Sequence, residues 1–137
     1  MRVLIIDDQI PFLNVLSAML MLIPDIEAVC SAQGGREGLK FAAEMQPDMV
    51  LTDYSMPEVD GMGVTRRLKA SSRPPQVIMM SFHAEREYRE MAVKAGVDAY
   101  LVKSDLDRDL VPTLKRLAAE ASGRAGLRPA GSVAAPI

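Results

Sequence analysis

The chain has 137 residues, of which 49% are hydrophobic and 25% charged, as in one globular domain that buries its own core. A formal net charge of −2 gives no electrostatic reason for this chain to bind nucleic acid or an anionic membrane. Cys30 is the only cysteine, so no internal disulfide can form, and no apolar segment reaches the ~20 residues of a membrane span. Because the first residues lead directly into a short apolar run, no signal peptide is recognisable, and we expect a cytoplasmic protein.

Short apolar runs alternate with segments of helical period along the chain. The runs cover residues 3–6, 26–30, 49–52, 76–81 and 99–102. Runs this short and this uniformly apolar are typical of strands in a parallel sheet that helices cover on both faces. The alternation therefore predicts an α/β fold, a doubly wound five-stranded parallel sheet flanked by helices.

The helix after the first run has a clear start and stop. Pro11 suits a first helical turn, and Pro24 ends the segment. The apolar positions expected to face the core are Phe12, Leu16, Met19, Leu20 and Ile23. Leu13, Met21 and Leu22 lie outside that stripe, which leaves two interpretations. The helix is either buried on a broad face, or it presents a docking surface to a kinase helix pair or a second receiver.

The later helices show similar patterns. Residues 84–95 repeat apolar side chains at intervals of three and four, and Gly96 supplies a C-terminal stop. Leucines at 106, 110, 114 and 117 form a last stripe, and Pro112 within it predicts a helix that starts late or bends. Residues 122–137 are rich in Ala, Gly, Pro and Arg without any period. We therefore expect a domain over residues 1–121 and a flexible tail or linker over 122–137.

Polar residues at the ends of the apolar runs are expected to meet at one edge of the sheet. Asp7 and Asp8 follow the first run, Asp53 follows the third, Ser81 ends the fourth and Lys103 follows the fifth. Parallel strands have their carboxyl ends at the same edge, so three carboxylates, a hydroxyl and an ammonium would share one pocket. Each residue alone could be a cap, a turn residue or a solvated side chain. Their joint placement favours a functional site.

The chemistry of this set indicates metal-assisted phosphoryl transfer. Three neighbouring carboxylates repel one another unless a cation neutralises them, and a site of oxygen ligands favours Mg²⁺. Asp53 would then be the nucleophile and form an aspartyl phosphate. The cation, the Lys103 ammonium and the Ser81 hydroxyl would stabilise the charge on the phosphoryl oxygens.

Four ordered segments make the sequence resemble the receiver domains of two-component response regulators. They are "LIIDD", "PDMVLTDYSMPEVDG", "VIMMS" and "AGVDAYLVK", within a resemblance that spans residues 2–117. The resemblance implies a flavodoxin-like (βα)5 fold and a signalling switch that turns over no metabolite. It also implies that Asp53 accepts a phosphoryl group from a sensor histidine kinase.

The same resemblance assigns roles to the other site residues. Asp8, with Asp7 acting through water, would bind Mg²⁺ together with Asp53 and the backbone carbonyl of Ser55. Lys103 would contact the phosphoryl group, Ser81 would move to hydrogen-bond it, and Tyr100 would turn inward as the aromatic switch. These movements would change a surface that a partner protein reads, and a homodimer formed on phosphorylation is a further expectation.

Some positions depart from the commoner receiver pattern. Ser104 replaces a proline after Lys103, as in receivers of the LuxR-like helix-turn-helix group, which leaves open whether that peptide is cis. Phe82 is bulky where a small residue is usual, so it could restrict access to the phosphoryl group. Ser55 and His83 are placed to influence how long the phosphate persists. His83, the only histidine, has a simpler interpretation as a surface residue before a helix.

Two other classes of function stay open at this stage. A Mg²⁺-dependent phosphatase or phosphotransferase would also use an aspartyl phosphate, but its "DxD" acids would follow the first strand, where this chain has adjacent acids. A flavodoxin-like cofactor binder would need a phosphate-binding loop at Asp7 and Asp8, where acids repel phosphate. The chain could be a stand-alone receiver or the N-terminal part of a transcription regulator whose DNA-binding domain lies outside it.

Overall fold

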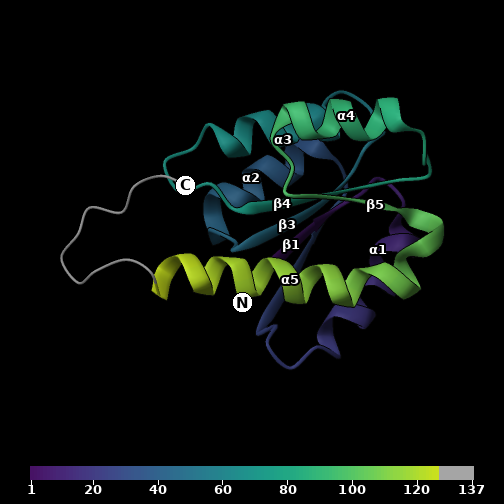
Figure 1. Ribbon diagram of the computed structural model, residues 1–137. Coiled ribbons are helices and arrows are strands. Elements are labelled where there is room, and N and C mark those ends of the chain that lie inside the picture. Colours follow the sequence, from purple (N-terminus) through teal and green to yellow (C-terminus); the bar gives the residue numbers. More distant parts are fainter. Residues whose placement is uncertain (127–137) are drawn as a thin grey trace.

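The computed structural model describes residues 1–126, with side chains for residues 1–123. The strands are β1 (Arg2–Ile6), β2 (Ala28–Ala32), β3 (Met49–Asp53), β4 (Gln76–Ser81) and β5 (Ala99–Val102). The helices are α1 (Ile10–Met21), α2 (Gly35–Met45), α3 (Gly61–Lys69), α4 (Arg86–Ala95) and α5 (Leu106–Gly126), with a 3₁₀ helix, η1 (Lys103–Asp105), before α5. Strands and helices alternate along the whole described chain (Figure 1).

The five strands form one parallel sheet in the order β2-β1-β3-β4-β5. Ile6 lies opposite Thr52 of β3, and Ser81 of β4 lies opposite Val102 of β5, so the carboxyl ends of neighbouring strands are level. The chain winds outward in opposite directions from β1 and β3, which makes the gap between these two strands the switch point of the sheet. The predicted doubly wound parallel sheet is confirmed.

Helices cover both faces of the sheet and produce two apolar layers (Figure 1). Side chains alternate across β1, so that Val3 and Ile5 pack with α1 and α5, whereas Leu4 and Ile6 pack with α2 and α3. The leucine stripe of α5, at 106, 110, 114 and 117, is buried in the first layer as predicted. None of the helices in the described residues is long and apolar enough to span a membrane.

The predicted position of the second strand is wrong by two residues. The apolar run predicts a strand over residues 26–30, but β2 runs from Ala28 to Ala32. Ile26 is buried in the core at 5% exposure although it precedes the strand. β2 lies at the edge of the sheet and pairs only with β1, so one of its sides is open and its own residues need not be apolar. The apolar run therefore marks the core contact of the preceding turn rather than the strand.

Broad burial, the first interpretation of α1, holds for only part of the helix. Leu13 is 3% exposed and belongs to the core, which corrects its placement outside the core stripe. Met21 and Leu22 are 54% and 84% exposed, so broad burial is wrong for them. Ile10 and Val15 are also exposed, at 49% and 61%, and we call these four residues of α1 and its C-cap the exposed apolar residues of α1.

The last helix also differs in detail from the prediction. α5 begins at Leu106, so Pro112 lies inside it and a late start is wrong. The helix continues to Gly126, past the expected domain end at residue 121. Residues 127–137 of the predicted tail lie outside the described residues.

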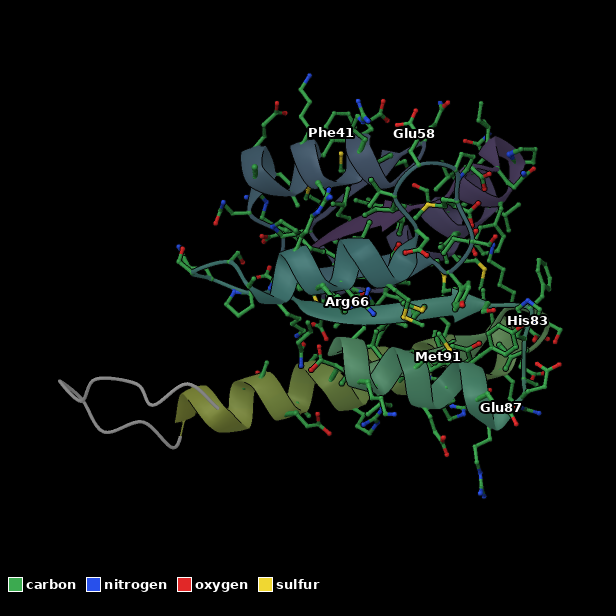
Figure 2. The ribbon with its side chains drawn as sticks, turned by 90° about the horizontal axis from the view of Figure 1, so that it is seen from above. Phe41, Glu58, Arg66, His83, Glu87 and Met91 are labelled. Carbon is green, nitrogen blue, oxygen red and sulfur yellow. The ribbon has the colours of Figure 1, made fainter. Side chains whose placement is uncertain are left out.

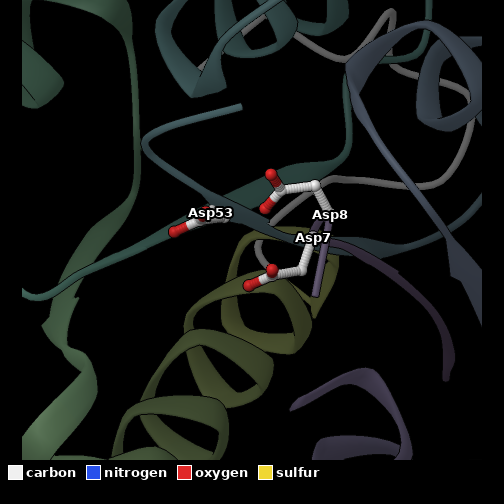
Figure 3. A group of neighbouring side chains, drawn as sticks. All are labelled: Asp7, Asp8 and Asp53. Atoms are coloured by element: carbon white, nitrogen blue, oxygen red, sulfur yellow. The ribbon is translucent and has the colours of Figure 1, made fainter. Parts of the chain in front are cut away.

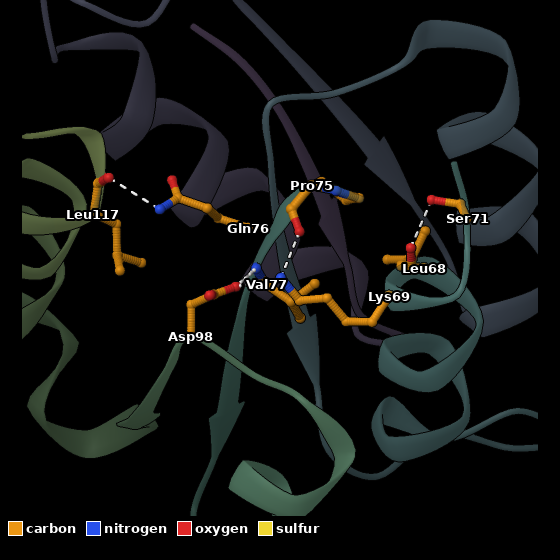
Figure 4. A network of polar contacts seen from close by, with 8 residues as sticks. All are labelled: Leu68, Lys69, Ser71, Pro75, Gln76, Val77, Asp98 and Leu117. Carbon is orange, nitrogen blue, oxygen red and sulfur yellow. Dashed lines mark hydrogen bonds and ion pairs between the residues drawn. The ribbon is translucent and has the colours of Figure 1, made fainter. Parts of the chain in front are cut away.

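A polar network connects helix α3 to strands β4 and β5 at the edge of the sheet opposite to the carboxyl ends of the strands (Figure 4). Asp98 accepts a hydrogen bond from the backbone N–H of Val77 at 2.7 Å and forms an ion pair with Lys69 at 2.6 Å. Lys69 also donates to the carbonyl of Pro75 at 2.8 Å. The network fixes the end of α3 to the start of β4 and to the turn before β5.

Candidate active site

The predicted site residues come together at the carboxyl edge of the sheet. β1 is followed by Asp7 and Asp8, β3 ends in Asp53, β4 ends in Ser81, and η1 begins with Lys103 directly after β5. Asp7, Asp8 and Asp53 each place a carboxylate oxygen within 4.8 Å of the others (Figure 3). The level strand ends bring together side chains that are up to 96 positions apart in the sequence.

The acids do not have the capping roles that a structural interpretation would give them. Gln9, not an aspartate, occupies the N-cap of α1, and its side chain makes no capping hydrogen bond. Asp7 accepts a hydrogen bond from the backbone N–H of Gln9 at 2.8 Å and is completely buried. The helix after β3 is capped by Asp60, which leaves Asp53 free of that role. Burial of carboxylates without a capping role favours a functional interpretation.

Lys103 is the cation that offsets this negative charge. Its ammonium lies 2.7 Å from Asp7 Oδ2 and 3.0 Å from Asp53 Oδ1, and its side chain is only 4% exposed. The peptide after Lys103 is trans, which answers the question that Ser104 left open. One ammonium cannot neutralise three carboxylates, so the cluster keeps a net negative charge suited to a divalent cation with oxygen ligands.

A cavity of about 570 Å³ opens above the acids. Its wall consists of Asp8, Gln9, Phe12, Asp53, Tyr54, Ser55, Ser81, Phe82, His83 and Lys103. Asp8 and Asp53 therefore face the open space, whereas Asp7 supports them from below through Lys103. Ser55, Phe82 and His83 line the wall, where the sequence placed them, and the Phe82 ring is 74% exposed.

Burial shifts the acid–base behaviour of Asp53. Desolvation raises the pKa of its carboxyl above the usual value, and the neighbouring Asp7 charge acts in the same direction. The hydrogen bond and the positive charge of Lys103 oppose this shift without reversing it. At a pH above this raised pKa, the ionised carboxylate of Asp53 therefore lowers the free energy of unfolding.

We expect this cost to appear in the pH dependence of stability of the metal-free protein. Because the folded pKa of Asp53 is raised, the folded state binds its proton more readily than the unfolded state. Asp53→Asn should therefore increase the free energy of unfolding at neutral pH by about 0.5 to 2 kcal/mol. The gain should shrink as the pH falls through the raised pKa, since Asp53 is then protonated in the wild type too.

Thermal unfolding in EDTA-containing buffer between pH 4 and 8 would measure this difference. Asp25→Asn, in the exposed turn after α1, is the matched control and should leave stability unchanged at every pH. A lower stability of Asp53→Asn at neutral pH would show that the Lys103 ion pair outweighs the burial of the carboxylate.

Ser81 and Tyr100, the predicted switch residues, are both hydrogen-bonded to the backbone of His83. The Ser81 hydroxyl accepts a hydrogen bond from the backbone N–H of His83 at 3.0 Å. Tyr100 is buried at 6% exposure, and its hydroxyl donates to the backbone carbonyl of His83 at 2.6 Å. Burial raises the pKa of Tyr100, which keeps that hydroxyl protonated as a donor. The loop after Ser81 is thus attached to the buried Tyr100.

Aromatic contacts around this loop were not predicted from the sequence. The His83 ring stacks on Tyr88 of α4 with centroids 4.0 Å apart, and both rings meet Tyr54 edge-on. Figure 2 shows His83 at the end of the molecule where α4 begins. Phe12 was also missed as a site residue, because its spacing indicated only a core position on α1. Its ring centroid lies 4.3 Å from the Lys103 ammonium.

Comparison with known proteins decides the family. A family model described as the response regulator receiver domain matches residues 3–115. The chain belongs to the response regulator receiver family. The nitrate/nitrite response regulator protein NarL of Escherichia coli K12 is 30% identical over 117 residues, which are 85% of this chain and 54% of that relative. A DNA-binding response regulator of the LuxR family from Staphylococcus aureus has a structure with a TM-score of 0.77 and 26% identity, covering 84% of this chain and 96% of that one.

These relatives confirm the predicted receiver fold and its LuxR-like character. A protein-glutamate methylesterase/protein-glutamine glutaminase from Nocardioides is 36% identical over 104 residues, which are 74% of this chain but 28% of that relative. The receiver chain spans about half the length of NarL and less of the methylesterase. Receiver domains similar to this chain therefore form part of longer proteins of different kinds.

Proposed function

We propose that this receiver is a Mg²⁺-dependent phosphorylation switch with Asp53 as the acceptor. The observation on which the proposal mainly rests is the position of Asp53, at the cavity, 3.0 Å from the Lys103 ammonium and in reach of two further carboxylates. The donor is a phosphohistidine of a sensor histidine kinase. We place the reaction in the cytoplasm, as the sequence predicted, and expect no turnover of a metabolite.

In the phosphoryl step, a carboxylate oxygen of Asp53 attacks the phosphorus of the donor. An O–P bond forms, the P–N bond to the donor imidazole breaks, and the leaving imidazole takes up a proton. The Lys103 ammonium exchanges its contact with the Asp53 oxygen for one with a phosphoryl oxygen, and it keeps its ion pair with Asp7.

The metal would be held by Asp8 and Asp53, with Asp7 acting through water and the backbone carbonyl of Ser55 completing the protein ligands. Carboxylates and carbonyls that face a cavity are the donor set that Mg²⁺ prefers, so these residues fit the ion. When bound, Mg²⁺ would neutralise charge on the phosphoryl oxygens.

The signal would leave the site through Ser81 and Tyr100. The phosphoryl group adds nearly two negative charges and new hydrogen-bond acceptors. The Ser81 hydroxyl, which accepts a hydrogen bond from the backbone N–H of His83, would move to donate a hydrogen bond to this group. Tyr100 would then hold the His83 carbonyl in the shifted loop. The state of this loop would set the surface of α4 that a partner reads.

Three residues of the cavity wall would set access and phosphate lifetime. Phe82 would narrow the entrance with its exposed ring, and His83 and Ser55 would border the path of the hydrolytic water.

The kinase partner must reach the same entrance to the cavity. We infer that it docks over α1, whose exposed apolar residues begin at Ile10, two positions after Asp8. A homodimer formed on phosphorylation would use the same helix.

The chain spans about half the length of the regulator NarL. We propose a transcription regulator in which a DNA-binding domain follows this receiver, because the similar NarL and LuxR-family proteins are named as regulators. This chain itself would bind protein partners and no nucleic acid, consistent with its net charge of −2.

Phosphorylation by a small-molecule donor tests the proposal. We expect one phosphoryl group per chain after incubation with acetyl phosphate and Mg²⁺, measured by intact-mass spectrometry, and none when EDTA replaces the metal. Peptide mapping should place the group on Asp53. An unlabelled but folded chain after treatment with both acetyl phosphate and a phosphorylated kinase domain would contradict the proposal.

A further inference from the structure

Two aromatic rings border the ammonium of Lys103. Its Nζ lies 4.3 Å from the ring centroid of Phe12 and 5.2 Å from that of Phe82. The same Nζ forms ion pairs with Asp7 and Asp53. The cation is thus held by two carboxylates and two aromatic rings, in a side chain that is only 4% exposed.

The two rings differ in how firmly they are held. Phe82 is 74% exposed and lies in the loop after β4, so little besides the ammonium fixes it. Phe12 lies in the first turn of α1, next to Pro11, and packs against the core layer formed by α1 and α5. Phe12 is therefore the ring with a fixed position, and it is also the nearer one.

A fixed ring at this distance has two effects on a lysine. The negative face of the ring attracts the ammonium, more strongly where water is excluded. The ring face is only a weak acceptor for N–H groups, so the strong hydrogen bonds of the ammonium are made to the carboxylate oxygens. Lysine otherwise has a long flexible chain, and holding it in one place favours the orientation that the reaction needs.

We propose that Phe12 is a positioning residue for phosphoryl transfer, because its ring holds the Lys103 ammonium against Asp53. This inference rests on the proposed function of Asp53 as the acceptor. Phe12 does not touch the reacting atoms, and it acts through Lys103 alone. The ring therefore matters for the rate only while residue 103 is a cation.

A purely structural role for Phe12 predicts something different. If the ring only fills space in the core, its removal should change stability, and a side chain of similar volume should restore activity. The test must therefore separate the π-face from the volume and must show that the effect passes through Lys103.

The test compares initial rates of phosphorylation by acetyl phosphate and Mg²⁺. Phe12→Leu, which keeps an apolar side chain, should lower the rate by about two- to thirtyfold, and Phe12→Tyr, which keeps the ring, should retain it. In the Lys103→Met background, Phe12→Leu should cause no further loss. Phe41→Leu is the matched control, since Phe41 is a half-buried phenylalanine of α2 packed against the other core layer (Figure 2). It should leave the rate unchanged.

Fluorinated phenylalanines at position 12 keep the test decisive if Phe12→Leu folds poorly. Fluorine weakens the negative ring face and changes the shape little, so the rate should fall stepwise with each added fluorine. A rate independent of fluorination, or an equal loss from Phe12→Leu in the wild-type and Lys103→Met backgrounds, would overturn the inference. Failure of the wild type itself to become phosphorylated would instead overturn the proposed function, so the two failures are distinguishable.

Discussion

Asp53→Asn is expected to abolish phosphorylation, lowering the rate with acetyl phosphate and Mg²⁺ by about 10⁴-fold or more. Asparagine has nearly the same shape, so Lys103 can keep its 2.7 Å ion pair with Asp7. What is lost is the anionic oxygen that attacks phosphorus, together with one of the three carboxylates proposed to hold the metal. The loss should therefore appear without unfolding, since the same variant is expected to be more stable at neutral pH.

The measurement is intact-mass spectrometry over time, with circular dichroism to verify folding. Asp25→Asn again serves as the control and should be labelled at the wild-type rate, because Asp25 lies in an exposed turn away from the acids. If Asp53→Asn still gains a phosphoryl group that maps to Asp8, the acceptor has been misassigned within the cluster. Labelling elsewhere in the chain would contradict a site at this edge of the sheet.

The sequence predicted four of the five strands to within one residue, and it predicted that the polar residues at their ends lie at one edge of the sheet. β4 and β5 have the predicted bounds, and β1 and β3 differ from theirs by one residue each. A central strand buried on both faces is mostly apolar, with buried Thr52 of β3 as an exception, so a polar residue at its last position marks the edge of the sheet. Asp53 and Ser81 could be found because they stand at such a transition.

Features that depend on packing between separate elements could not be predicted in this way. Phe12 belongs to the core stripe of α1 by spacing, and nothing in the sequence states that its ring meets Lys103, 91 positions later. The stacking of His83 on Tyr88 likewise depends on the angle at which α4 leaves the loop. Both contacts arise because the carboxyl edge collects the loops of all strands, while the pattern of one segment describes only that segment.

Gly61 shows the same limit within one of the segments that carry the receiver resemblance. Its place after Asp53 suggests turn chemistry, but no positive φ is found at this position. What requires glycine is a close approach of backbones. A Cβ at residue 61 would lie 2.3 Å from the carbonyl oxygen of Asp53 and 3.0 Å from the Cα of Tyr54. The start of α3 thus rests directly on the end of β3, the strand that bears Asp53.

We expect Gly61→Ala to be the most destabilising of the substitutions considered, by about 3 kcal/mol. The atoms in the way are backbone atoms, which cannot rotate aside, so either α3 or the end of β3 must move. A shift of β3 would displace Asp53 from Lys103 and slow phosphorylation as well. Thermal and urea unfolding would measure the first effect, and the rate with acetyl phosphate the second.

Gly123→Ala provides the contrasting case in the same chain. Gly123 lies on α5, and a Cβ at this residue would meet no atom within 4 Å apart from its chain neighbours and the nearby backbone of its own helix. Alanine should therefore stabilise the helix by up to about 1 kcal/mol without changing the rate. Changes of opposite sign in the free energy of unfolding for Gly61→Ala and Gly123→Ala would establish that Gly61 is required for close backbone contact rather than for flexibility. Equal and small losses of stability would mean that α3 can move away from β3 freely. The end of β3 that bears Asp53 would then be held less rigidly than the close approach at Gly61 implies.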